Sequence, residues 1–173
     1  VVAMTGECLN HEALKRAGEI LKNGGLVAFP TETVYGLGGD ALNPQASKKI
    51  YAAKGRPSDN PLIVHIADMD SLYRIVKTVP EKIFQKSDIV PMETTGGLDT
   101  VAVRFPSDPV AAALIRAAGG YVAAPSANTS GRPSPTTAQH VEEDLGDAID
   151  MIIDGGAVGI GLESTIVDFT EEI

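Results

Sequence analysis

Apolar residues recur at helical spacing in several stretches of the chain, each opened by a capping residue or a proline. The clearest runs over residues 11–22, where Asn10 can cap the start and Gly24-Gly25 ends the pattern. The same pattern predicts four further helices. They run over 44–53, from Asp68 to about Lys77, from Ser107 or Pro109 to Gly119, and from Thr136 or Thr137 to Leu145.

Short apolar runs between these helices predict strands. They cover residues 26–29, 62–66, 100–105, 122–124, 151–153 and 165–169. Helices that alternate with short strands are typical of an α/β fold. Because some connections are short, we expect neighbouring strands of both orientations, in a twisted open mixed sheet with helices packed on it. The length and the absence of a linker predict a single domain over residues 1–173.

Composition narrows the class of protein. Hydrophobic residues make up 43% of the chain, but no apolar run approaches the ~18 residues of a membrane span. Because its one cysteine, Cys8, cannot form an internal disulfide, we expect a cytoplasmic protein. The net charge of −9 argues against broad nucleic-acid binding. An anionic small substrate remains possible if the few basic residues gather in one cleft.

Four polar loops, rich in glycine and proline, adjoin the predicted strands. They cover residues 29–38, 54–62, 124–134 and 155–165. Loops at strand ends in an open sheet converge on the ligand site. Lys54 and Arg56 flank a glycine, which suits a polyphosphate, and the 124–134 loop offers hydroxyls, an amide and backbone N–H groups to a nucleotide. Each loop alone could be an ordinary polar turn, but four in one short chain favour a site.

Several common catalytic motifs are absent from the sequence. It contains no phosphate-binding P-loop, dinucleotide fingerprint or nucleophile elbow. His11, His65 and His140 are too scattered for a zinc site, and of the three only His65 lies at a predicted strand end beside the basic loop. Without a nucleophile, catalysis would depend on orientation and charge neutralisation, as in phosphoryl and nucleotidyl transfer.

Three of these motifs together resemble the YrdC family. They are the run from Phe29 to Gly38, the Lys-Gly-Arg of residues 54–56 with Asn60-Pro61-Leu62, and the Ser-Ala-Asn of residues 126–128. The resemblance covers nearly the whole chain and implies a deep cationic cleft. It also implies a nucleotidyltransferase reaction, in which L-threonine, bicarbonate or CO2, and ATP give threonylcarbamoyl-AMP and pyrophosphate. In that family the product serves to modify an adenosine of tRNA.

The resemblance also implies roles for individual residues. It places Lys54 and Arg56 in catalysis as cations that neutralise the departing pyrophosphate. The implied L-threonine site contains Thr33, His65, Arg104, Ala124 and Ser164. The implied ATP site contains Arg56, Asn60, Thr100, Ser126, Asn128 and Ser134. Mg²⁺ is expected to arrive with ATP, and no protein metal site is expected.

The sequence departs from the family in two places. Members carry a Trp-Pro-Gly-Pro stretch and a strand between the region of Glu81 and the Lys86-Ser87-Asp88 run, whereas this chain has no tryptophan. Either the protein is a reduced variant of the family, or residues are missing between Ile83 and Lys86. We expect the second, with a break in the backbone there. The family also continues beyond Ile173, with a last strand and a nucleotide-binding arginine.

Two other functions remain open from the sequence. YrdC-like domains also adenylate carbamoyl phosphate in hydrogenase maturation, and a non-catalytic RNA-binding module is a second alternative. The net charge of −9 and the lack of interleaved basic and aromatic residues argue against the RNA-binding module. For the synthase, a threonylcarbamoyl transferase that uses the product would be the downstream partner, with at most weak contact to tRNA.

Overall fold

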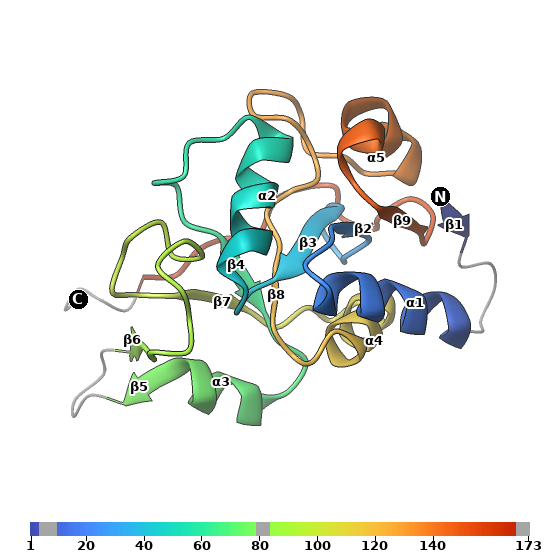
Figure 1. Cartoon of the computed structure of the whole chain (residues 1–173). Coiled ribbons are helices and arrows are strands. Elements are labelled where there is room, and N and C mark those ends of the chain that lie inside the picture. The colour runs from blue at the N-terminus through green and yellow to red at the C-terminus, as the bar shows by residue number, and fades with distance from the viewer. Residues whose placement is uncertain (4–9, 79–83, 169–173) are drawn as a thin grey trace.

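A seven-stranded mixed sheet forms the centre of the protein in its computed structural model (Figure 1). The structure describes residues 1–3, 10–78 and 84–168. The strand order is β1-β9-β2-β3-β8-β4-β7, and β5 and β6 form a separate two-stranded sheet. The strands are β1 Val2–Ala3, β2 Val27–Phe29, β3 Gly36–Asp40, β4 Ile63–His65, β5 Val76–Thr78, β6 Phe84–Lys86, β7 Ala102–Arg104, β8 Val122–Ala123 and β9 Met151–Asp154.

Strand direction changes along the sheet, which confirms the predicted mixed α/β fold. β1, β9 and β2 are parallel to one another, as are β4 and β7 at the other end. Between them β2, β3, β8 and β4 pair antiparallel. The helices are α1 His11–Lys22, α2 Pro44–Lys54, α3 Met69–Ile75, α4 Pro109–Ala117 and α5 Ala138–Leu145, with the 3-10 helix η1 Gly146–Ala148 after α5.

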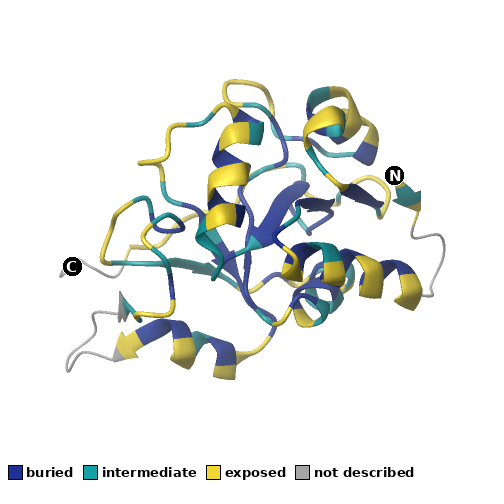
Figure 2. Cartoon of the chain, viewed as in Figure 1, coloured by how far each residue is buried: buried dark blue, intermediate teal, exposed yellow. Residues whose placement is uncertain are grey.

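Helices cover both faces of the sheet. Because side chains alternate along a strand, Val27 and Phe29 of β2 join α1 and α4 in one apolar cluster, whereas Ala28 joins α2 and α5 in another. Figure 2 shows the result, with buried strands at the centre and exposed residues on the outer helix faces. No described helix is long and apolar enough to cross a membrane.

The predicted helix starts agree with the caps in the structure. Asn10 accepts a hydrogen bond from the Ala13 N–H at 3.0 Å, and Thr137 caps α5 through the His140 N–H. The helix after Asp68 was predicted to reach about Lys77, but it ends at Ile75. The chain becomes extended at Val76 because β5 pairs with β6 there.

Two strand predictions need correction. β3, Gly36–Asp40, begins inside the loop predicted over residues 29–38, and its glycines carry little strand propensity. Close packing explains them, since a Cβ on Gly38 would lie 3.0 Å from both Phe29 and Val122 side chains. Conversely, residues 165–168 of the strand predicted over 165–169 form no strand, and Phe169 lies outside the described residues.

The expected backbone break between Ile83 and Lys86 falls partly outside the described residues, because 79–83 are not among them. From Phe84 to Lys86 the chain runs as β6, paired with β5. A break before Phe84 therefore stays a prediction.

Candidate functional site

Arg104 at the end of β7 is the centre of a polar cluster. Its Nη2 donates to Glu32 Oε1 at 2.6 Å, Thr33 Oγ1 at 2.8 Å and Thr31 Oγ1 at 3.3 Å. The arginine and glutamate side chains are only 17% and 28% exposed. A partly buried, charge-assisted contact of this kind is stronger than a surface ion pair, so the guanidinium is held in one position.

The turn that follows β2 is fixed by its own hydroxyl group. Thr31 Oγ1 donates to the Val34 carbonyl at 2.6 Å and accepts from the Thr33 N–H at 3.2 Å. Such short-range bonds replace the backbone partners that a turn lacks. Both threonines are buried, so their hydroxyls are presented to Arg104 in a fixed arrangement.

His65 lies beside Arg104, because β4 and β7 pair in parallel with these two residues in register. Burial lowers the pKa of His65 to about 4, and the nearby Arg104 charge adds to the shift. The ring is therefore neutral at neutral pH. Its Nδ1 is 3.2 Å from the Ile63 carbonyl, so Nδ1 is the protonated nitrogen and Nε2 is left as an acceptor.

Lys54 forms a second cluster with the loop after β8. Its Nζ, at the end of α2, donates to the backbone carbonyls of Ser126 and Asn128. The Asn128 amide in turn donates to the Thr129 and Arg132 carbonyls at 2.9 and 2.8 Å. Burial lowers the pKa of Lys54 to about 8, with Arg56 adding to the effect. The lysine thus binds the loop rather than a carboxylate.

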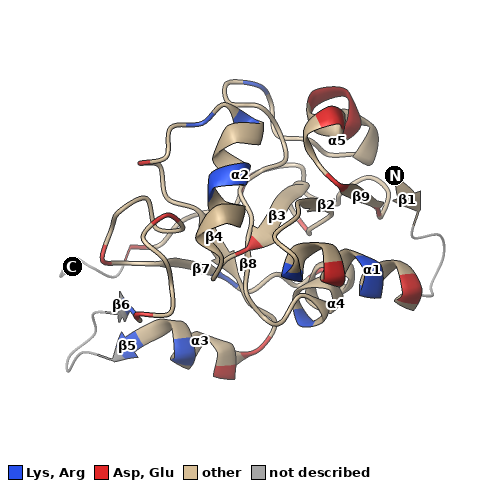
Figure 3. Cartoon of the chain, in the orientation of Figure 1, with Lys and Arg blue, Asp and Glu red and all other residues tan. Residues whose placement is uncertain are grey.

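The far side of the same loop is anchored to α5. Asp144, in the acidic stretch of that helix (Figure 3), accepts from the Thr129 N–H at 2.8 Å and from Arg132 Nη1 at 2.6 Å. Burial opposes ionisation of Asp144, but the Thr129 and Arg132 hydrogen bonds outweigh it and lower the pKa. The loop is therefore held at both ends.

The 29–38 segment connects the two clusters. Gly36 pairs with Ser126 as an isolated antiparallel bridge. Beside it the Leu37 N–H donates to the Pro125 carbonyl and the Ala127 N–H to the Tyr35 carbonyl, both at 2.8 Å. One segment thus carries Thr33 at one end and contacts Ser126 at the other.

The remaining expected site residues lie around these clusters with fewer contacts. Ala124 is buried, and its N–H donates to the Ile63 carbonyl in the strand that bears His65. Arg56 Nη2 reaches the Pro61 carbonyl at 3.3 Å, while its buried Nε has no partner among the described residues. Ser134 Oγ donates to Glu163 at 2.5 Å. Asn60, Thr100 and Ser164 make no side-chain hydrogen bond within the described part of the chain, and Asn60 and Ser164 are exposed.

Residues 158–163 lie across the threonine-bearing turn. The Ile160 and Gly161 N–H groups donate to the Glu32 and Thr33 carbonyls at 3.2 and 2.9 Å. Sequence reasoning did not single out Glu32. The only available signal was a carboxylate between two threonines directly after a buried strand.

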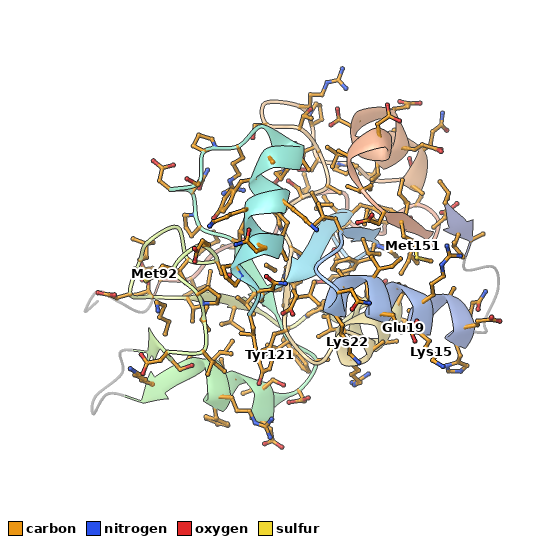
Figure 4. The ribbon with its side chains drawn as sticks, in the orientation of Figure 1. Lys15, Glu19, Lys22, Met92, Tyr121 and Met151 are labelled. Carbon is orange, nitrogen blue, oxygen red and sulfur yellow. The ribbon has the colours of Figure 1, made fainter. Side chains whose placement is uncertain are left out.

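Two surface hollows lie away from these clusters. One, of about 310 Å³, runs along α1 beside Lys15, Glu19 and Lys22 (Figure 4). The other, of about 440 Å³, lies between α2 and residues 92–97, next to Met92. Among the described residues, no group of three or more His, Cys, Asp or Glu side chains could hold a metal ion.

Residues 19–173 match the Sua5/YciO/YrdC family, which is described as "Telomere recombination". The chain is 47% identical to the threonylcarbamoyl-AMP synthase of Pyrococcus abyssi, over 99% of this chain and 55% of that protein. It is 49% identical to the Bacillus subtilis protein of the same name, over 95% of this chain and 52% of the relative. The crystal structure of P. abyssi Sua5 complexed with L-threonine matches with a TM-score of 0.92 and 48% identity, over 98% of this chain and 54% of that one.

This chain therefore spans about half the length of each of these relatives. The alignment with the P. abyssi synthase runs over 186 positions, so at least 13 of them have no counterpart among the 173 residues here. The match over residues 19–173, with these identities, shows that the chain belongs to the Sua5/YciO/YrdC family.

Proposed function

We propose that this chain forms threonylcarbamoyl-AMP and pyrophosphate from L-threonine, bicarbonate or CO2, and ATP. The observation that carries the proposal is the pairing of Gly36 with Ser126. It brings an amino-acid site around Arg104 and a nucleotide site around Ser126 to opposite ends of one short segment. The P. abyssi relative that was solved with L-threonine supports the first of these sites.

In the proposed amino-acid site, Arg104 receives the substrate carboxylate and Thr33 and His65 lie beside the substrate. Neutral His65 offers Nε2 as an acceptor to the threonine hydroxyl. Ala124 and Ser164 complete the proposed set of contacts. The substrate amine, as the free base, forms an N–C bond to CO2 and releases one proton to solvent, which gives an N-carboxylate. A carboxylate oxygen then attacks the α-phosphorus of ATP, and the bond to the departing pyrophosphate breaks.

In the proposed nucleotide site, the loop over 124–134 receives the nucleotide through Ser126, Asn128 and Ser134. Arg56 neutralises the departing pyrophosphate, since its Nε has no other partner in the described chain. Lys54 acts on the loop through its contacts to Ser126 and Asn128, and Asn60 and Thr100 lie at the rim. Mg²⁺ is proposed to arrive on the phosphates of ATP, because the described residues offer no carboxylate cluster for it.

We propose further that residues 1–173 act as one catalytic domain in the cytoplasm. The product would pass to a separate threonylcarbamoyl transferase that modifies tRNA. Any direct contact with tRNA would be weak, because the chain carries a net charge of −9.

Pyrophosphate release from ATP tests the proposal directly. With bicarbonate present, L-threonine should give faster release than serine or glycine, and omission of the amino acid should abolish it. Preferential use of carbamoyl phosphate would instead indicate the hydrogenase-maturation reaction. Tight RNA binding with no release from any substrate would indicate a binding module and overturn the proposal.

A further inference from the structure

The two carboxylate oxygens of Glu32 have different surroundings. Oε1 accepts from Arg104 Nη2 at 2.6 Å, whereas Oε2 is buried and has no hydrogen-bond partner in the described chain. A buried carboxylate oxygen without a donor loses its hydration and gains nothing in return. An orphaned acceptor of this kind at a candidate site needs an explanation.

Glu32 is negatively charged in the folded protein. Burial opposes its ionisation, but the hydrogen bond and charge of Arg104 outweigh burial and lower the pKa of the carboxyl. The backbone N–H groups of Glu32 and Asp108 also favour the charged carboxylate and lower its pKa, although neither meets the geometry of a hydrogen bond to Oε2. The neighbouring threonine hydroxyls face Arg104. Oε2 is therefore an acceptor on a charged carboxylate that receives no hydrogen bond from the described residues.

Arg104 has unused donors on the same side chain. All its hydrogen bonds to described residues come from Nη2, which leaves Nη1 and Nε without partners there. An arginine fork of this kind matches a carboxylate. Arg104 thus keeps donors for a carboxylate, while Glu32, bonded to it through Oε1, keeps Oε2 as an acceptor.

An α-amino acid carries the complementary pair of groups, a carboxylate and an ammonium on one carbon. We infer that Glu32 Oε2 accepts a hydrogen bond from the α-amine of the substrate while Arg104 binds its α-carboxylate. The inference rests on the proposed function, and makes Glu32 the residue that selects free α-amino acids over other small carboxylates. It also directs the amine, which is the group that must take up CO2.

A simpler role for Glu32 would be to orient Arg104 and nothing more. The two roles differ in what they predict for a ligand that lacks the amine. If Glu32 only orients Arg104, its loss weakens every carboxylate ligand to the same extent. If it binds the amine, its loss weakens only ligands that carry one.

Calorimetric binding without ATP separates these roles, with L-threonine and 3-hydroxybutyrate as probes. The second probe is threonine without its α-amine. The unaltered protein should bind 3-hydroxybutyrate about 10- to 100-fold more weakly, which is the usual size of a charged hydrogen bond in a partly buried site. Glu32→Gln should weaken L-threonine by a similar factor and leave 3-hydroxybutyrate unchanged or tighter.

Matched variants keep the test interpretable. Glu32→Asp retains the charge on a shorter side chain and should give an intermediate affinity for L-threonine. Arg104→Lys should weaken both probes together. Glu143→Gln, on the exposed face of α5, should change neither. A thermal midpoint for each variant confirms that it is folded.

Equal weakening of both probes by Glu32→Gln would overturn the inference, as would unchanged L-threonine binding or a protein that binds no L-threonine at all. Failure of the proposed function has a different signature. In that case Glu32→Gln would lose L-threonine binding selectively, but the unaltered protein would release no pyrophosphate. This result would support the contact between Glu32 and the amine and would exclude adenylation.

Discussion

Lys54 and Asn128 lie 74 positions apart in the sequence, yet the lysine ammonium donates directly to the asparagine backbone carbonyl in the interior. No carboxylate of the described chain forms an ion pair with this lysine. Burial of an ammonium group costs stability, so we interpret the contact as one that positions the loop rather than one that stabilises the fold. It fixes the loop that we propose as the nucleotide site.

Replacement of Lys54 by methionine should therefore damage ATP use more than folding. Two carbonyls lose their donor, at a cost of about 1–3 kcal/mol each, but the cost of burying the charge disappears as well. We expect pyrophosphate release to fall at least about tenfold while the protein stays folded. Initial rates together with a thermal midpoint would check this, and full activity in Lys54→Met would contradict it.

The stability difference between the unaltered protein and Lys54→Met should depend on pH. Burial lowers the pKa of Lys54 from 10.5 to about 8. Between these two values the unfolded chain holds more protons than the folded one, so raising the pH favours folding. Urea midpoints measured from pH 7 to 10.5 should rise for the unaltered protein relative to the variant, with the change setting in near pH 8.

Replacement of Arg56 should likewise affect activity far more than stability. Its one hydrogen bond to a described residue is a 3.3 Å contact to the Pro61 carbonyl. Arg56→Ala should change the free energy of unfolding by less than about 1 kcal/mol. We expect the KM for ATP to rise tenfold or more, and Arg56→Lys to restore it only in part because the planar fork is lost. An unchanged KM would remove Arg56 from the nucleotide site.

Selectivity for threonine should depend on its hydroxyl group. His65 is a buried residue whose Nε2 is an acceptor, and this acceptor would be left unpaired by 2-aminobutyrate, which has threonine's shape without the hydroxyl. That loss corresponds to a decrease of roughly 10- to 100-fold in kcat/KM. Serine keeps the hydroxyl and lacks one methyl, worth about 1–3 kcal/mol. Equal turnover of threonine and 2-aminobutyrate would show that the hydroxyl is not recognised.

Helices α1 and α4 cross at Gly18 with no room for a side chain. A Cβ there would lie 2.6 Å from the Ala117 carbonyl oxygen. Gly18→Ala should destabilise the protein by about 1–3 kcal/mol, which lowers the thermal midpoint by roughly 2–4 °C per kcal/mol. The matched control is Gly146→Ala, where φ is −51° and the nearest atom is 3.5 Å away, and it should be neutral or slightly stabilising.

Local signals in the sequence were enough to predict most of the fold. Asn10 and Thr137 mark helix starts through bonds to residues three positions away, which the sequence order itself displays. β3 escaped prediction because its glycines are explained by contacts with Phe29 and Val122, which no local pattern reveals.

The same distinction applies to the site. Arg104, at a strand end, was recognisable from the sequence as a carboxylate partner. Glu32, by contrast, is bonded to Arg104, which lies 72 positions away in the sequence. The unpaired Oε2 of Glu32 is visible only in the three-dimensional structure. Sequence motifs therefore indicated the loops of the site, whereas the roles within them depend on distant contacts.

Strand β9 has a consequence for how the protein is made. It lies between β1 and β2, so Val2 and Val27 pair with Ile153 and Met151 respectively. A ribosome produces the first two strands long before the residues that join them. Until β9 has been made, the apolar Val27 and Phe29 lack the neighbouring strand that helps to bury them, and chaperones can bind them. The sheet is consequently completed only after β9 has been made, and contacts of such long range make that step slow.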